Sequence, residues 1–436
     1  MPPTARKTAT AKNRITTVEQ LEAIIGRPSA MVRMKELAEL DDACRDMLAV
    51  ASLAGFGHLD AGGRPRTTVI GGRPGFARPE SSTRLAIVTD LDVTGPVSFV
   101  FLLPGVGETL RVNGTVAERT PGHLVITVEQ AYVHCARAIL RSRLWSPPGR
   151  QRLPTSAGRR TPAITTDDPP PPGKDAPGHP AADRPSETVG DHLRPPAHAG
   201  APGRPPADAD DPGGPLSEPG VREALAATPF VVLSSWDGDG SSDTSSDTSS
   251  DTSPRGDVAG FVRVLDGHTL AIPDRRGNKR ADTSRNLLTD GRLSAAALMP
   301  GSTDVLHLSG TAVPTDDPDL LAGMAQGSAV PQLALVVTVE HAEVRHNQAL
   351  ADANIWDASG HADDATRTEL MASTTRQLAA KTPALRGLAK LLAVFARLLR
   401  RAIDATYRRA LRKEGYDLPT PDTATGASDR HERQNG

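Results

Sequence analysis

The chain has 436 residues, of which 38 are Pro and 39 are Gly, and only 3% are aromatic. Its length allows two or three domains, but this composition means that much of it cannot form a packed core. A formal net charge of −2 gives no global electrostatic basis for binding nucleic acid. The two cysteines, Cys44 and Cys135, are too few for a disulfide framework and lack the spacing of zinc ligands.

Residues 1–14 are basic, rich in Ala and Thr, and predicted to be disordered. No apolar core follows them, so we expect no secretory signal. No stretch of the chain reaches the roughly 18 consecutive apolar residues that suggest a membrane span. We therefore expect a cytoplasmic protein.

The first predicted domain covers residues 15–146 (copy one). Apolar residues at helical spacing predict helices between Thr17 and Leu53. Short apolar runs then predict strands, and the last of them leads into a predicted helix over 129–143. The predicted strands are 67–70, 85–88, 97–103, 109–112 and 124–128.

A Pro-rich tract over 147–215 contains too few apolar residues to offset its ordering entropy, and we expect a disordered linker there. Order is predicted to resume near Glu218 with a short helix, followed by strands through residue 340. The second predicted domain covers 216–358 (copy two).

The two domains align with each other. Segment 102–115 matches 298–311 through a shared Leu-x-Pro-Gly and a shared Gly-Thr, and 127–133 matches 338–344 through a shared Thr-Val-Glu. A Trp follows at the same offset in each copy. Two matches in the same order indicate an internal duplication.

The tetrapeptide Ser-Ser-Asp-Thr occurs three times over 241–252, directly before Ser253. One repeat would be enough for a turn between strands, so we expect an expanded, mobile loop. Its Asp residues recur every four positions, which does not match the ligand spacing of an EF-hand, and we expect no metal site.

A basic segment over 275–285 is the most informative feature of copy two. It contains Arg275, Arg276, Lys279, Arg280 and Arg285, interleaved with Gly, Asn, Thr and Ser. Guanidinium groups supply forked donors, hydroxyls and amides supply neutral donors, and Gly lets the backbone approach closely. Such a mixture suits a phosphate monoester, and a solvated basic face is the alternative.

The order strand, Ser-Pro-Arg-Gly, strand, strand, basic segment, strand resembles the flavin-binding split barrels of the pyridoxamine 5'-phosphate oxidase superfamily. It is most similar to a group of FMN-dependent proteins of that class. Their pattern S-P-R-G-D, G-F-V, I-P-D-R-x-G-N-x-R-x-D-T-x-x-N and P-G-x-x-x-x-L-x-x-x-G-T matches residues 253–257, 260–262, 272–286 and 300–311. The resemblance implies a mainly β (α+β) fold: two tandem split β-barrels that form a pseudo-dimer.

The copies differ where the resemblance places chemistry. Pro104 follows Leu85 by 19 positions, whereas Pro300 follows Leu270 by 30, so copy one lacks the basic segment. We align its residues 69–74 with Ser-Pro-Arg-Gly of copy two. Conversely, 134–145 of copy one matches the family ending H-C-x-[KR]-A-x-x-R-S-x-L-W, of which copy two keeps only the Trp.

In the resembled proteins each flavin lies between two subunits and contacts both. The resemblance therefore implies one FMN site per chain, composed of the basic segment of copy two and the 134–145 ending of copy one. The residues expected to bind the cofactor are Ser253, Arg255, Gly256, Arg276, Asn278, Lys279, Arg280, Thr283 and Ser284 in copy two and Arg141, Ser142 and Trp145 in copy one.

Within that set, Lys279 and Arg280, supported by Arg276, are expected to hold the phosphate, and Arg255 is expected to lie along the flavin. We assign no catalytic residue. His134 and Cys135 are adjacent on the predicted helix and would point about 100° apart, so a buried Cys beside a structural His is the favoured interpretation.

Residues 362–415 are predicted to form a basic amphipathic helical extension, and 416–436 a disordered tail. The apolar stripe within 385–413 is interpreted as a face docked on the barrel or on a second chain, with peripheral membrane or acidic-partner contact as the alternative.

The sequence thus predicts an FMN-binding flavoprotein, with FMN-dependent oxidation or reduction of an unidentified small molecule as its function. A deazaflavin or haem in the same groove, and a non-catalytic flavin-binding or regulatory module, remain as alternatives. Whether such chains associate further is left open.

Overall fold

The computed structural model describes residues 13–29, 32, 36–146, 213–238, 250–380, 396–416 and 418. The predicted disorder of residues 1–12, most of the predicted linker, and most of the predicted tail lie outside these ranges. A few residues of each segment predicted to be disordered are described, and these contact the folded part of the chain or form a short helix. Arg14 pairs with Thr315, Pro215 begins a short 3-10 helix (η2, Pro215–Ser217), and Tyr416 is buried.

Copy one forms a seven-stranded antiparallel sheet in the order β2-β1-β5-β6-β7-β4-β3. Each of the predicted runs coincides with a strand or part of one, to within one residue. Its strands are β1 (Leu53–Leu59), β2 (Pro65–Gly71), β3 (Ala77–Pro79), β4 (Arg84–Val88), β5 (Pro96–Leu102), β6 (Thr109–Thr120) and β7 (His123–His134).

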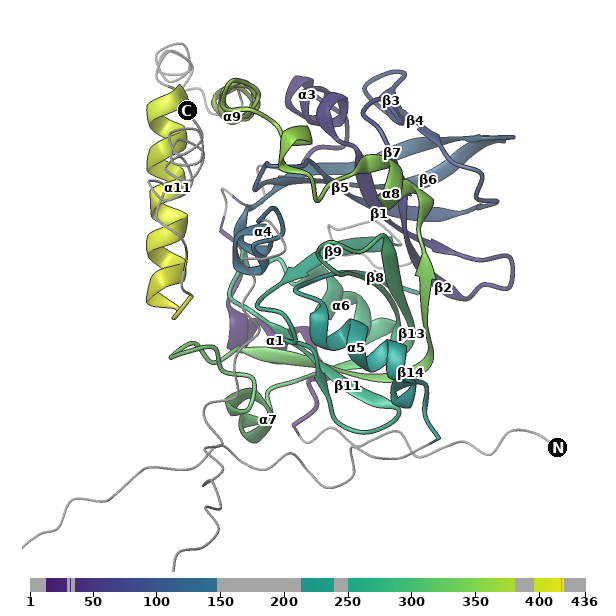
Figure 1. Ribbon diagram of the computed structural model, residues 1–436, viewed down its shortest axis with the longest axis vertical. Helices are drawn as coiled ribbons and strands as arrows, with labels where there is room; N and C mark the ends of the chain where they lie inside the picture. Colours follow the sequence, from purple (N-terminus) through teal and green to yellow (C-terminus); the bar gives the residue numbers. More distant parts are fainter. Residues whose placement is uncertain are drawn as a thin grey trace, which may run out of the picture. The chain divides into compact units, whose positions relative to one another are not determined.

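Copy two repeats this topology strand for strand, in the order β9-β8-β12-β13-β14-β11-β10 (Figure 1). One bulge also coincides, because the register shifts at Gly114 in β6 and at Gly310 in β13; β6 has a second shift between Val116 and Glu118. The predicted pair of tandem split barrels is therefore confirmed. Its strands are β8 (Phe230–Trp236), β9 (Ser250–Gly256), β10 (Arg263–Val264), β11 (Thr269–Asp274), β12 (Arg292–Leu298), β13 (Asp304–Thr315) and β14 (Leu333–His346).

Two local predictions for copy one were wrong. Strand β7 continues to His134, paired with β6 throughout, so the predicted helix over 129–143 is reduced to α4 (Arg137–Ser142). In addition, the β-sheet register aligns Ser253–Gly256 with residues 68–71, one position earlier than the 69–74 expected from sequence, because Gly71 and Gly256 occupy equivalent places opposite β1 and β8.

The third Ser-Ser-Asp-Thr repeat is not part of a loop. Asp251 and Thr252 belong to β9, where they pair with β8 and are at most 2% exposed. Antiparallel pairing fixes the inward or outward direction of every side chain in β9. The first two repeats, which we expected to be a mobile loop, lie outside the described residues.

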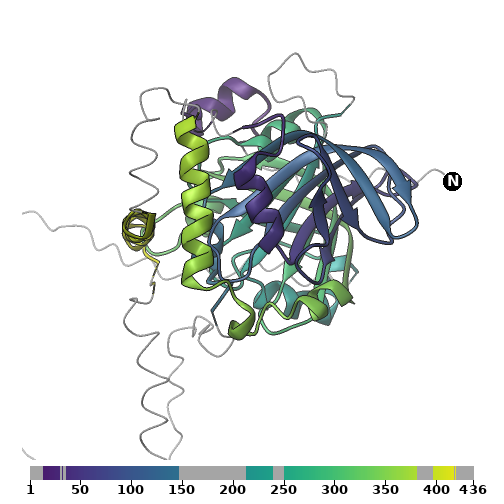
Figure 2. The same ribbon diagram turned by 90° about the horizontal axis from the view of Figure 1, so that it is seen from above.

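The helices cross between the copies. Helix α1 (Val18–Ile25), assigned by sequence to copy one, packs through Leu21 against Leu333 of copy two. Helix α3 (Asp42–Val50) packs on copy one, and α9 (Asp364–Ala380) runs beside it, with Leu370 joining that core (Figure 2).

The remaining helices lie around the two barrels. Helix α6 (Asp282–Thr289) lies in the connection between β11 and β12, where copy one has only a short loop over residues 89–95. The other helices are α5 (Pro219–Ala227), α7 (Pro318–Ala322), α8 (Gln348–Ala353), η3 (Ala358–Gly360) and α11 (Ala396–Lys413).

The copies bury a shared core. One apolar cluster combines residues of both sheets, including Leu53, Val100, Phe230 and Leu298, all of them fully buried. Each copy also packs a helix against a strand of the other copy. Helix α4 of copy one contacts β9, where a Cβ on Gly256 would lie 2.0 Å from the Ala138 carbonyl oxygen, and α8 of copy two contacts β2. This reciprocal packing is the geometry of a two-fold dimer within one chain.

Candidate functional site

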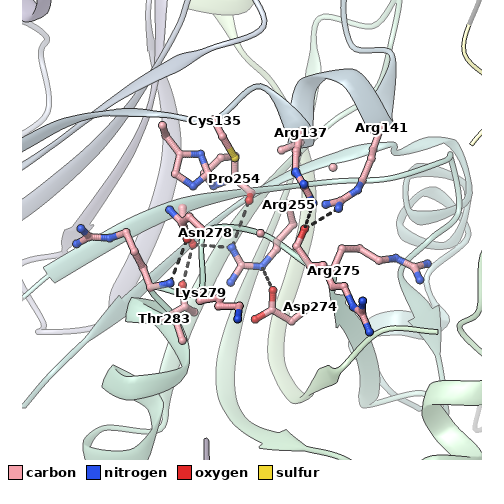
Figure 3. A pocket seen from close by; sticks show the side chains of 18 of the residues that line it. Cys135, Arg137, Arg141, Pro254, Arg255, Asp274, Arg275, Asn278, Lys279 and Thr283 are labelled. Atoms are coloured by element: carbon pink, nitrogen blue, oxygen red, sulfur yellow. Dashed lines mark hydrogen bonds and ion pairs between the residues drawn. The ribbon is translucent and has the colours of Figure 1, made fainter. Parts of the chain in front are cut away.

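A pocket lies where the two copies meet, and residues of both form its wall (Figure 3). Copy one contributes the end of β7, the start of α4, and Arg111 from β6. Copy two contributes β9, the end of β11 and the basic segment. Eight cationic side chains line this composite pocket against three carboxylates, so it favours an anion. The cations are Arg111, Arg137, Arg141, Arg255, Arg275, Arg276, Lys279 and Arg280.

Most of the residues expected to bind the cofactor line this pocket. They are Ser253, Arg255, Gly256, Arg276, Asn278, Lys279, Arg280, Thr283 and Arg141. The remaining three do not line it. Ser142 is buried and donates to the Ile139 carbonyl at 3.0 Å, and Ser284 is fully buried in α6.

Trp145 has a structural contact instead. Its indole N–H donates to the Val106 carbonyl at 2.6 Å, and Trp356 of copy two donates to the Ser302 carbonyl at 2.7 Å. The two acceptors occupy aligned positions. Because both copies make the same bond, the shared Trp is explained by folding of each barrel.

The basic segment forms a turn that leads into helix α6, whose first residues line the pocket. Lys279 and Ala281 have positive φ angles of 63° and 58°, a left-handed conformation that folds the backbone tightly. No side chain caps α6, since Ala281 stands at its N-cap. The N–H groups of a first helical turn and the helix dipole favour a bound anion.

Arg275 anchors this turn. Its Nε donates to the buried Asp257 carboxylate at 2.6 Å, and its terminal nitrogens donate to the carbonyls of Met324 and Ala329. Although Arg275 lines the pocket, these bonds hold it in a structural role.

The other cations of the segment divide into paired and exposed groups. Arg280 is 94% buried, forms ion pairs with Glu36 and Asp282, and lies over the Tyr132 ring with 4.2 Å between its guanidinium carbon and the ring centroid. Arg285 pairs with Glu22 of α1 at 2.7 Å. The side chains of Arg276 and Lys279 are exposed.

Two arginines of α4 line the pocket. Arg137 and Arg141 both donate to the Arg276 carbonyl, at 3.1 and 2.7 Å. Both also contact the Glu414 carboxylate, at 3.3 and 3.0 Å. The segment after α11 therefore neutralises the cations that copy one presents to the pocket.

Arg255 reaches along the opposite wall. It donates to Ser253 Oγ at 2.9 Å, and its Nε lies 3.8 Å from Asp274. Ser253 Oγ in turn lies 2.7 Å from Thr283 Oγ1, which joins β9 to α6. The repeat preceding Ser253 does not disrupt β9, since this strand pairs with β8 from Ser250 to Gly256.

His134 and Cys135 line the pocket but do not share a helix. His134 is the last residue of β7, and Cys135 lies in the connection to α4. Both are partly buried. The 100° spacing of helical neighbours therefore does not describe these two side chains.

Sequence reasoning missed an ionic cluster at the pocket floor. Arg111 of β6 pairs with Asp251 of β9, and both side chains are 3% exposed. Burial raises the pKa of Asp282, but the charges of Arg280 and Arg111 outweigh it and leave that pKa below its usual range. No local pattern could have identified this cluster, because its members are far apart in sequence.

A second groove occupies the pseudo-equivalent place. It contains Thr67 and Thr68 of β2 with His307, Arg345 and His346 of copy two, positions that align with Thr252, Ser253, Arg111, His134 and Cys135. Its cavity volume is about 510 Å³, against about 100 Å³ for the composite pocket. The difference follows from the basic segment, which fills one groove and is missing from the other.

Within the described part of the chain, no cluster of three or more His, Cys, Asp or Glu side chains is arranged to bind a metal ion. Among the helices that the structure describes, none combines the length and apolar composition of a membrane span.

Fold and site together define a duplicated split barrel with one strongly cationic groove between its copies. Residues 217–348 match the sequence profile of the pyridoxamine 5'-phosphate oxidase family. Copy two therefore belongs to the pyridoxamine 5'-phosphate oxidase-like split-barrel superfamily, and copy one repeats its strand order. Proteins of this family generally bind a flavin or haem.

Similar solved structures include HupZ from Group A Streptococcus, at 15% identity and a TM-score of 0.23, covering 29% of this chain and 90% of that one. A histidine-to-alanine variant of HupZ aligns at 14% identity and a TM-score of 0.24, covering 29% of this chain and 98% of that one. No curated protein matches the chain.

Proposed function

We propose that the protein binds one FMN in the composite pocket and acts as an FMN-dependent oxidoreductase on a small molecule. The observation that carries this proposal is the pocket itself, whose wall contains eight cationic side chains from both copies and the start of a helix that no side chain caps. These donors suit the dianionic phosphate of FMN. When bound, FMN would supply hydride transfer, while the protein supplies orientation and electrostatics.

The donors available for the phosphate differ from those expected from sequence. Arg280 is already paired with Glu36 and Asp282, so the phosphate falls to Lys279 and Arg276, with Asn278, Thr283 and the first-turn amides of α6 as neutral donors. Arg255 would lie along the ring and favour its anionic reduced form.

The cavity of about 100 Å³ is smaller than the roughly 300 Å³ at which ligand pockets begin. The donor set fits the cofactor, but pocket side chains must move to admit all of it. Arg137 and Arg141, which Glu414 and the Arg276 carbonyl hold in the pocket wall, are the side chains best placed to do so.

Titration of the full-length apoprotein with FMN tests the proposal, with an expected stoichiometry of one per chain. Lys279→Ala removes one charge-assisted contact and should weaken binding by about tenfold or more. Arg345→Ala in the second groove is the matched control and should leave binding unchanged. A stoichiometry near two, or equal effects of the two variants, would contradict the composite site.

The absorption spectrum of the protein as purified separates FMN from deazaflavin and haem. A bound flavin that no nicotinamide or deazaflavin donor reduces would favour the alternative of a non-catalytic flavin-binding module.

A further inference from the structure

An ion pair between the copies lies at the floor of the composite pocket. Arg111 belongs to β6 of copy one, and Asp251 to β9 of copy two, so the pair joins the two barrels. Both side chains are 3% exposed. Loss of either partner would leave the other as a buried, uncompensated charge, which is costly.

The surroundings fix the Arg111 guanidinium. Its terminal nitrogen lies 3.6 Å from Asp282, and its central carbon lies 5.0 Å from the Tyr132 ring centroid. The Tyr132 hydroxyl donates to the same Asp282 carboxylate at 3.3 Å. Two carboxylates and an aromatic face thus hold one arginine against the pocket.

One donor of that arginine is unused. Among the described residues, Arg111 Nε is buried and has no hydrogen-bond partner. A buried N–H group that lacks a partner costs free energy, and native proteins rarely leave one. Arg111 lines the pocket, so a ligand can supply the acceptor once the pocket side chains move to admit it and uncover Nε.

The second groove shows that the barrel does not require this pair. The strand registers align Arg111 with His307, and Asp251 with Arg66. His307 forms a hydrogen bond with the Thr67 carbonyl at 2.9 Å. The cation Arg66 stands where the composite pocket has the anion Asp251. Since the same two strand positions are filled differently in the other groove, the Arg111 and Asp251 pair belongs to the chemistry of the composite pocket.

We propose that Arg111 is a ligand-binding residue that donates its Nε–H to a neutral acceptor, a ring carbonyl or ring nitrogen of the cofactor, and that Asp251 positions it. This inference rests on the proposed function. Asp251 and Asp282 already neutralise Arg111, so it is poorly suited to a phosphate. No carboxylate of the described ranges forms an ion pair with the exposed Lys279 or Arg276. The cofactor therefore binds with its ring toward Arg111 and its phosphate toward Lys279 and Arg276.

Binding of FMN and of riboflavin, which lacks the phosphate, tests this orientation in the full-length protein. Arg111→Lys keeps the charge but loses the Nε donor, and should weaken both ligands equally, by about tenfold. It should also shift the flavin absorption band. Lys279→Ala should weaken FMN and leave riboflavin unchanged. Arg66→Lys in the second groove should alter neither.

The double variant Arg111→Met with Asp251→Leu separates binding from folding. Replacing a buried ion pair by apolar side chains commonly preserves stability, so the melting temperature of the apoprotein should be retained while flavin affinity stays low. Wild-type affinity in this variant or in Arg111→Lys would overturn the inference. Failure of the wild-type protein to bind FMN would instead overturn the proposed function.

Discussion

Individual positions of the two copies show which residues serve the fold and which serve the site. Trp145 and Trp356 keep both identity and hydrogen bond, and they lie outside both grooves. Arg141 aligns with Asp352, so the charge at this position of the composite pocket is reversed in the other copy. Shared residues thus stabilise the barrel, and the differing ones make the two grooves chemically unlike.

His58 provides a prediction at this scale. It is 6% exposed, stacks on Phe56 with ring centroids 4.8 Å apart, and burial lowers its pKa from 6.5 to about 4. The unfolded chain takes up this proton below pH 6.5 and the folded protein only below about 4, so stability falls across that window. From pH 7 to pH 5 the loss from this group should be about 2 kcal/mol.

Urea unfolding at pH 7 and pH 5 measures that loss. His58→Phe should reduce the difference between the two pH values by about 2 kcal/mol. An undiminished pH dependence in His58→Phe would show that other groups cause it.

Helix α11 is anchored at two places along its length. Arg400 attaches its first half to Glu108 of copy one at 2.8 Å, and Leu411 near its end is fully buried. The helix is therefore docked on the barrel, as the favoured interpretation held. Most of the predicted apolar stripe, over 385–395, lies outside the described residues. Leu398, Arg401, Arg409, Arg412 and Lys413 remain exposed, so contact with a partner through this face stays a prediction.

Glu414 should influence ligand binding through its contacts with Arg137 and Arg141. Glu414→Gln removes the carboxylate that neutralises both arginines, so FMN affinity should rise, by about tenfold. Glu108→Gln breaks the other anchor of α11, away from the pocket, and should lower the melting temperature without changing affinity. Weaker FMN binding in Glu414→Gln would show instead that the carboxylate positions the arginines.

At the scale of the whole molecule, the copies behave as two subunits joined in one chain. Their interface contains an apolar core and buried hydroxyl contacts that follow the pseudo-symmetry. Thr67 lies 2.6 Å from Ser294, and Ser98 lies 2.6 Å from Thr252. Neither set of contacts depends on the covalent connection between the copies.

Fragments 1–151 and 206–436 should therefore associate when produced together. Each alone would expose the shared apolar core, whereas the pair restores it. We expect a 1:1 complex on size-exclusion chromatography that binds FMN as the intact chain does. Two folded fragments that migrate separately would show that the interface requires the connection.

The sequence by itself determined most of the strands, the duplication and the cationic segment, because each leaves a local record in burial period, turn residues or charge. It missed β1 for a physical reason. Gly55 and Gly57 weaken the strand pattern, yet they are required where β1 crosses β8, since a Cβ on Gly57 would lie 2.3 Å from Ser234 Oγ. It also mistook the end of β7 for a helix, because the β6 partner that extends this strand is distant in sequence.

Only the tertiary structure decided which residues face one another across the copies. Docking of the two barrels brought Arg111 to Asp251, and docking of the terminal helix placed Glu414 on Arg141. Folding within copy one bound Trp145 and Ser142 to backbone carbonyls of that copy and kept them out of the pocket wall. Such pairings depend on how two sheets and a terminal helix pack, and the energy of packing is shared among many residues far apart in the chain. No single segment of sequence encodes it.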